Sequence, residues 1–269
     1  MTSSELRNPP LDTARRLAED GDLDGAAAIL SELAADPDGP DRAQAAVGLA
    51  VVLEERGDLD GARAAARAAL ATGHPEYAAQ AACHLAQGFE REGRAEQARG
   101  AWQAVLGLGT AAYVPLAHLA LARLAVQAGA LDEGEASLRE AGAAAVAAGD
   151  DETAAHAAQQ LADLMLERGE PGEAAEVLLD ALEAAPAEVA PRLRVQLGIA
   201  HLEMACAEFA GAVEDGADAG TSALAIELLA RTLPLRGRDD DAEHVWAYGL
   251  DHEDETLAAD VRLRRDRDT

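Results

Sequence analysis

The stretch Glu54-Glu55-Arg56-Gly57-Asp58-Leu59-Asp60-Gly61-Ala62 separates two segments with helical apolar periodicity, residues 43–55 and 59–70. A glycine can adopt φ > 0 without steric cost, so Gly57 can end the first helix. The carboxylate of Asp58 can then cap the first turn of the second helix. The stretch therefore predicts a tight turn that reverses the chain between two helices.

The same turn recurs along the chain. Gly21, Gly57, Gly93 and Gly129 are each 36 positions apart, and Gly169 and Gly237 lie in later copies. A weaker copy around 206–212 lacks the turn glycine. A helix-turn-helix unit repeated at such a period predicts a solenoid, in which each repeat packs mainly on its neighbours.

We predict an all-α fold in one domain, 1–269, made of seven repeats. The repeats lie roughly at residues 11–38, 41–73, 75–107, 111–149, 150–186, 188–219 and 221–251. In the sixth we expect a first helix over 188–202 and a short second helix over 208–217, weakened by Gly211 and Gly216. A capping helix over 253–267 follows, with Leu257 and Val261 on one face.

The composition agrees with closely packed helices and narrows the function. Alanine, the best helix former, dominates, and aromatic residues make up 3% of the 269 residues. The formal net charge is −28 and every basic residue is an arginine, which makes nucleic acid and anionic membrane surfaces poor partners. We expect a cytoplasmic protein, because residues 1–10 contain no apolar signal segment and Cys83 and Cys206 are far apart.

The repeats resemble the tetratricopeptide repeat (TPR). The second unit matches its pattern of small and apolar residues around a turn glycine and a second-helix alanine, at Ala46, Leu49, Ala50, Leu53, Gly57, Ala62, Ala66 and Ala69. The third, fifth and seventh units match in the same way, around Gly93, Gly169 and Gly237. Gly134 departs from the pattern, since it stands where the second-helix alanine is expected. The resemblance implies a right-handed α-α superhelical solenoid.

The resemblance also implies where a partner would bind. In TPR proteins the first helix of each pair lines the concave groove, and carrying those positions over marks a polar set on this chain. The set comprises Gln44, Gln80, Gln87, Arg91, Arg123, Gln127, His156, Gln159, Asp163, Arg194, His201 and Arg231. Some TPR proteins hold a chaperone's carboxyl terminus with lysines and asparagines; this chain has no lysine and no asparagine after Asn8, which disfavours that partner.

Two interpretations of Arg123, Arg194 and Arg231 remain open. They can form a positive strip that binds an acidic peptide through bidentate guanidinium–carboxylate contacts. Alternatively, each pairs with a neighbouring acid such as Asp163 or Glu227, or extends into water.

We predict a non-catalytic scaffold that binds a peptide or a partner protein in its groove, as a monomer or homodimer. Nucleotide-binding loops and nucleophile elbows are absent from the sequence, and no two of His84, His118, His156 and His201 are expected on one helix, so no metal or other cofactor is predicted. Trp102 and Trp246 are expected in the core. Two rival functions are a ligand-sensing regulator with residues 208–217 as its hinge, and a structural subunit that self-assembles through Leu257, Val261 or the sixth repeat.

Overall fold

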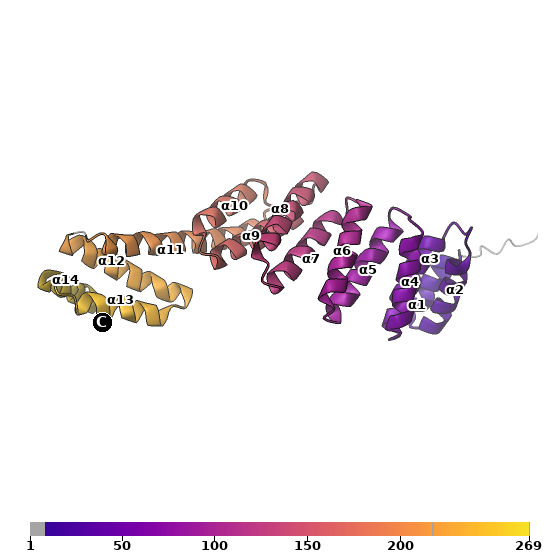
Figure 1. Ribbon diagram of the computed structural model, residues 1–269, viewed down its shortest axis with the longest axis horizontal. Coiled ribbons are helices and arrows are strands. Elements are labelled where there is room, and N and C mark those ends of the chain that lie inside the picture. The colour runs from indigo at the N-terminus through magenta and orange to yellow at the C-terminus, as the bar shows by residue number, and fades with distance from the viewer. Residues whose placement is uncertain (1–8, 217, 269) are drawn as a thin grey trace, which may run out of the picture. The chain divides into compact units, whose positions relative to one another are not determined.

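The computed structural model describes residues 9–216 and 218–268, and every regular element within them is helical (Figure 1). The chain divides into two compact units at Ala157 and Ala158, within one helix. We describe unit 1 (residues up to 157) and unit 2 (residues from 158) separately. The all-α repeat fold is confirmed, whereas its organisation as one domain stays a prediction. Residues 1–8, where we predict no signal segment, and Ala217, at the end of the proposed hinge, lie outside the described residues.

Unit 1 consists of successive helix pairs, in which we call the first helix A and the second B. The pairs are α1 (Pro10–Glu19) and α2 (Leu23–Ala35), α3 (Arg42–Glu55) and α4 (Leu59–Ala71), α5 (Tyr77–Arg91) and α6 (Ala95–Leu108), and α7 (Val114–Gln127) and α8 (Leu131–Ala148). The B helices α2, α4 and α6 each pack on their own A helix and on the A helix of the next pair. The B helix α8 is longer than the others of unit 1, with 18 residues.

The turn at Gly57 has the predicted geometry. Gly57 has φ = +84°, its N–H donates to the carbonyl of Glu54 at 2.8 Å, and the N–H of Asp58 donates to that of Leu53 at 2.8 Å. These two bonds satisfy carbonyls that the end of α3 would leave unpaired. The carboxylate of Asp58 accepts a hydrogen bond from the N–H of Gly61 at 2.9 Å and so caps α4.

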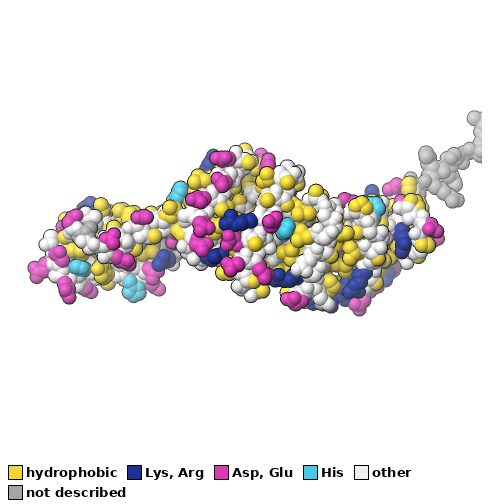
Figure 2. Space-filling model, turned by 45° about the horizontal axis from the view of Figure 1, so that its top comes forward, with side chains coloured by type: hydrophobic (Ala, Val, Ile, Leu, Met, Phe, Trp, Pro, Cys, Tyr) yellow, Lys and Arg dark blue, Asp and Glu magenta, His cyan; other side chains and the backbone are white. Residues whose placement is uncertain are grey.

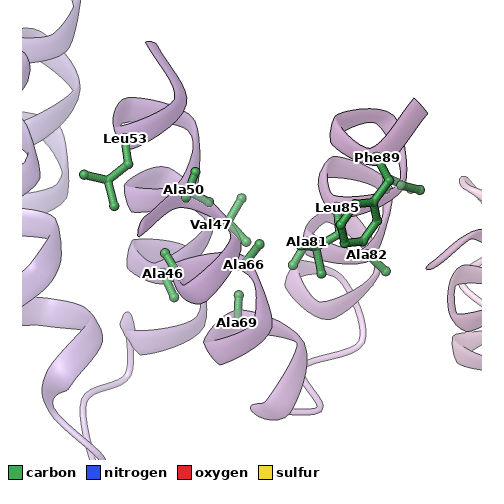
Figure 3. Close-up of a cluster of buried hydrophobic side chains, with 14 of the residues drawn as sticks. Ala46, Val47, Ala50, Leu53, Ala66, Ala69, Ala81, Ala82, Leu85 and Phe89 are labelled. Atoms are coloured by element: carbon green, nitrogen blue, oxygen red, sulfur yellow. The ribbon is translucent and has the colours of Figure 1, made fainter. Parts of the chain in front are cut away.

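Alanine lets the helices of unit 1 approach closely. Figure 3 shows the cluster between α3, α4 and α5, where Ala50 and Ala66 lie between larger side chains such as Leu53 and Phe89. Ala66 and Ala86 are fully buried. Close packing also explains why Gly134 stands where the repeat pattern has an alanine. A Cβ at this position would lie 2.8 Å from a Cγ of Val126 on α7. A glycine allows α8 to pack closely on α7 at this point.

Unit 2 contains the remainder of α9 (Asp151–Glu167) and a less regular set of helices. They are α10 (Pro171–Ala184), α11 (Ala190–Glu214), α12 (Ala219–Thr232), the 3-10 turn η1 (Leu233–Arg236), α13 (Asp239–Leu250), α14 (Glu255–Arg265) and the 3-10 turn η2 (Asp266–Asp268). The pair α12 and α13 forms the last repeat, and α14 packs on both helices.

The predicted helix pair of the sixth repeat is wrong. Its residues form a single helix, α11, which continues for 25 residues (Figure 1). Met204, Ala205, Cys206 and Ala207 stand where a turn is needed, and they include neither a residue suited to φ > 0 nor a capping side chain. The helix therefore continues to Glu214, and the hinge predicted to begin at Glu208 lies inside it.

The carboxyl-terminal helix caps unit 2 as predicted. Leu257 and Val261 of α14 are 6% and 0% exposed and pack with Ala223 and Ile226 of α12. Because these two side chains are buried within their own unit, they are unavailable for the homodimer contact considered above. Leu263 is 64% exposed and lies away from this core.

Two glycine-to-alanine substitutions should change stability in opposite directions. Gly57→Ala forces a side chain into the left-handed region and should lower the free energy of unfolding by about 1–2 kcal/mol. Gly100→Ala, in the exposed interior of α6 with no neighbouring atom within 4 Å of the new Cβ, should raise it by about 1 kcal/mol. Urea unfolding followed by circular dichroism measures both, and equal effects would contradict the assigned role of the turn.

Candidate functional site

Three A helices of unit 1, α3, α5 and α7, share three positions that lie on one side and stand 13, 6 and 2 residues before the turn glycine. We call these nine residues the A-face; only Gln44 among them is half-buried. They are Gln44, Val51 and Glu55 on α3, Gln80, Gln87 and Arg91 on α5, and Leu116, Arg123 and Gln127 on α7. The repeated register produces this face, because residues at such spacings lie on one side of a helix. Figure 2 shows one side of the molecule, on which patches of acidic side chains alternate with arginines and apolar groups.

The A-face is rich in amides and poor in acids. It carries four glutamines and one carboxylate, in a chain with 50 acidic residues. The side chains of Gln44, Gln80, Gln87 and Gln127 make no hydrogen bond with any other residue of 9–216 and 218–268. An exposed primary amide can donate two hydrogen bonds and accept two, so these groups are available to a ligand.

The two A-face arginines pair with acids on the preceding A helix. Arg91 forms an ion pair with Glu54 of α3, and a carboxylate oxygen of Glu54 also lies 2.9 Å from the Nε2 atom of His84. Burial lowers the pKa of His84 below its ordinary value; the carboxylate of Glu54 opposes this shift and the charge of Arg91 adds to it. Glu54 thus links α3 to α5 through two contacts.

The next link has the same form. Arg123 of α7 pairs with Glu90 of α5, and Glu90 also accepts a hydrogen bond from the indole Nε1 of Trp102 on α6. Trp102 is 1% exposed, so the predicted core role is confirmed. Glu90 therefore joins three helices.

The predicted site residues of unit 2 are less uniform. Asp163 accepts from the Nε2 of Gln196, which also donates to the backbone carbonyl of Gln159 at 2.9 Å. Burial raises the pKa of Asp163, and the bond from Gln196 opposes that shift. Arg231 pairs with Glu227 at 3.2 Å, while Arg194 and His201 are exposed on α11.

These contacts favour the second interpretation of the arginine strip. Arg123 and Arg231 are paired with acids, and the acid named for Arg231, Glu227, is its observed partner. Asp163 pairs with a glutamine instead of an arginine. Arg123 and His156 lie in unit 1, whereas Gln159, Asp163, Arg194, His201 and Arg231 lie in unit 2. Their role in binding stays a prediction.

The pairing of Arg91 with Glu54 and of Arg123 with Glu90 was not predicted from the sequence. Glu54 and Glu90 stand three residues before successive turn glycines, and an arginine follows each by 37 and 33 residues. This spacing is the signal that could have identified the pairs. Glu54, His84 and Arg91 also line a small pocket of about 210 Å³, whose other charged residues, Arg63 and Glu92, pair with each other.

Within 9–216 and 218–268 there is no group of three His, Cys, Asp or Glu side chains placed to hold a metal ion. Cys83 and Cys206 are buried free thiols, and burial raises the pKa of Cys83 to about 11, so its thiol stays protonated. None of the helices in the described part of the chain combines the length and apolar character needed to cross a membrane.

The repeated turn geometry identifies the architecture. Gly21, Gly57, Gly93, Gly129, Gly169 and Gly237 all have φ between 68° and 84°, and each joins an A helix to a B helix, through η1 in the last repeat. An alanine at the matching position of α2, α4, α6, α10 and α13 is buried. The chain has a TPR-like repeat fold.

Comparisons with solved structures find several proteins of low identity, with TM-scores below 0.5. A TPR protein from Parabacteroides merdae is 16% identical, over 95% of this chain and 97% of that one, with a TM-score of 0.49. A thermophilic TPR protein from Thermus thermophilus is 25% identical, over 72% and 97%, with a TM-score of 0.39. PilW, a type IV pilus biogenesis factor, is 16% identical, over 96% and 99%, with a TM-score of 0.47. No family model and no curated protein matches the sequence, so nothing about function follows from these similarities.

Removing the acceptor of Trp102 should destabilise this TPR-like protein. Glu90→Leu leaves the buried indole N–H and the guanidinium of Arg123 without their partner, and should lower the free energy of unfolding by about 1–3 kcal/mol. Glu90→Gln keeps an acceptor oxygen and should cost less. Urea unfolding of the two variants checks this, and equal losses would show that the hydrogen bond to Trp102 contributes little.

The cluster around His84 should make stability depend on pH. Because its pKa is lowered in the folded state, the unfolded chain binds a proton more readily, and stability falls as pH drops through the ordinary histidine range toward the folded value. The groups that face it are Glu54, Arg91, Arg63 and Glu92. Between pH 7 and pH 5, His84→Gln should lose less stability than the wild type; parallel curves would contradict the assignment.

Proposed function

We propose that this protein is a non-catalytic scaffold and that the A-face of unit 1 binds an extended segment of a partner protein. The observation that carries the proposal is the group of four A-face glutamines on α3, α5 and α7, whose amides make no hydrogen bond to another described residue. The packed helices fix the positions of these residues before binding, so only the side chains and the bound segment lose conformational freedom, and many modest contacts can add up.

The chemistry of the A-face suits a peptide backbone. A glutamine amide can donate to a peptide carbonyl and accept from a peptide N–H. Packed helices lie about 8–10 Å apart, and an extended peptide advances about 3.3 Å per residue. The amides of Gln44 and Gln80, at the same position of the contacting helices α3 and α5, can therefore contact peptide groups about three residues apart. Val51 and Leu116, which are 41% and 40% exposed, supply apolar contacts beside them.

The arginines allow acidic side chains on the bound segment. The side chains of Arg91 and Arg123 remain 60% and 48% exposed despite their pairing with Glu54 and Glu90. A guanidinium has five N–H donors, so it can bind a second carboxylate while keeping the first. The paired acids reduce the net attraction, which is why we place the main contribution on the amides.

A cytoplasmic location remains part of the proposal. Both cysteines are free thiols in the structure, as a reducing compartment would keep them. The oligomeric state enters the proposal as monomer or homodimer, without the contact through Leu257 and Val261.

The experiment compares two sets of amide substitutions. The triple variant Gln80→Ala/Gln87→Ala/Gln127→Ala removes the A-face amides, and Gln97→Ala/Gln103→Ala removes exposed amides from the B helix α6. Each variant and the wild type are immobilised separately and incubated with lysate of the source organism. The retained proteins are then quantified by mass spectrometry. With about 0.5–1.5 kcal/mol per hydrogen bond, the triple variant should retain a genuine partner at least about tenfold less.

The control variant should retain the partner at the wild-type level. Equal retention by all three proteins would place the binding surface outside the A-face and overturn the proposed site. Circular dichroism first confirms that the variants keep their helical content.

A further inference from the structure

The sixth repeat lacks its B helix, and this absence leaves one A helix without a neighbour. In unit 1 the A helices α3, α5 and α7 pack against the B helices of the preceding repeats, which are α2, α4 and α6 respectively. In unit 2, α11 packs against α10 in the same way. Because α11 does not turn back, α12 packs on α11 directly and has no preceding B helix beside it.

A hollow lies where that helix would pack. It has a volume of about 500 Å³ and is lined by four successive elements of unit 2, α11, α12, η1 and α13, and by residues at the turn before α10. The apolar part consists of Cys206, Ala207 and Ala210 on α11, Leu229 and Leu233 on α12 and η1, and Val245 on α13. Cys206, Leu233 and Ala242 form a small buried cluster beneath it, against which Leu229 and Val245 pack.

Three of the four α11 residues that line the hollow, Cys206, Ala207 and Ala210, are small. Ala207 is exposed and Ala210 is half-buried, although both stand on a helix that packs on α10 and α12. Small side chains permit a short distance between helix axes, as Ala62 and Ala66 do where α4 packs on α3 and α5. The hollow thus has the surface of a helix-packing site without a helix in it.

We propose that this hollow binds an amphipathic α-helix of a partner protein, with alanine and leucine on its apolar stripe and arginine or lysine on its flanks. The site goes beyond the A-face, since it lies in unit 2 and involves different helices. The bound helix takes the place of the missing B helix.

The charge at the rim indicates basic flanks. Glu203, Asp241 and one cation, Arg238, line the hollow, and Asp239 and Asp240 stand in the same first turn of α13 as Asp241. Glu203 pairs with Arg236 at 2.8 Å and Asp241 with Arg238 at 2.7 Å, whereas Asp239 and Asp240 are exposed. On a chain with net charge −28, a basic helix gains attraction where an acidic one is repelled.

The length of the bound helix follows from the repeat. The B helices α6 and α10 have 14 residues each and α13 has 12, so a helix of about four turns spans the same distance. A volume of about 500 Å³ holds only one face of such a helix, which leaves its charged flanks at the rim.

The test uses the full chain and designed 14-residue peptides, a length taken from α6 and α10. One peptide carries leucine and alanine at helical spacing with arginine on the flanks, a second has glutamate in place of arginine, and a third has the first composition in scrambled order. Fluorescence anisotropy measures binding. We expect the arginine peptide to bind at least tenfold more tightly than the other two, and to gain helical circular dichroism on binding.

Two substitutions locate the site. Ala210→Trp fills the hollow, and Ala207→Arg adds a positive charge at an exposed position that folding does not require to be small. Each should weaken binding of the arginine peptide at least tenfold, whereas Ala259→Trp on the exposed side of α14 should leave it unchanged. The A-face variant Gln80→Ala/Gln87→Ala/Gln127→Ala should also bind normally, which separates this inference from the proposed function.

Several results would overturn the inference. Equal binding of the scrambled peptide would show that net charge alone accounts for the affinity. Unchanged affinity in both Ala210→Trp and Ala207→Arg would place the peptide elsewhere. Loss of self-association in these variants, measured by light scattering, together with no peptide binding, would make a second copy of the chain the occupant.

Discussion

The left-handed glycine turn is the constraint on which this structure depends. A helix of alanine, leucine and glutamate has no intrinsic reason to end, because these residues all favour continuation. Gly57 ends α3 because its backbone adopts φ = +84°. In this conformation the N–H groups of Gly57 and Asp58 donate to the last carbonyls of the helix. Asp58 then begins α4 within one residue. Each such turn sets a B helix against its A helix, and the alanines between them set how closely the two pack.

The acid-to-cation links form a second layer of order in unit 1. Glu54 and Glu90 stand at equivalent positions of successive A helices, and each receives a cation from the next one. Half-exposed pairs of this kind contribute little stability individually. They do specify the register between helices whose contact surfaces are otherwise similar stretches of alanine, since a shift by one turn would leave Trp102 and the carboxylates without partners.

The sequence permitted prediction of the turns, the helices and most of the core, because each depends on local chemistry. Gly57 and Asp58 act within a few residues, and the burial of Ala62 or Leu85 follows from helical spacing. The sixth repeat was mispredicted because its match to the repeat pattern outweighed the missing glycine, although the residues 204–207 favour one continuous helix. The pairing of Arg123 with Glu90 depends on how successive repeats pack, which no local pattern in either helix reveals. The hydrogen-bond and ion-pair partners of the other predicted site residues could not be predicted from the sequence for the same reason.

The absence of one turn glycine changes which apolar side chains of unit 2 are exposed. When α11 continues past Cys206, the residues that would have formed a B helix extend an A helix instead, and α12 loses the neighbour that α3, α5 and α7 all have. The apolar side chains of Leu229, Leu233 and Val245, which a B helix would have covered, then line an open hollow. A regular repeat array buries such groups between its own helices. A single interruption therefore turns an internal packing surface into an external one, while the amide-bearing A-face of unit 1 stays regular because its own turns are intact.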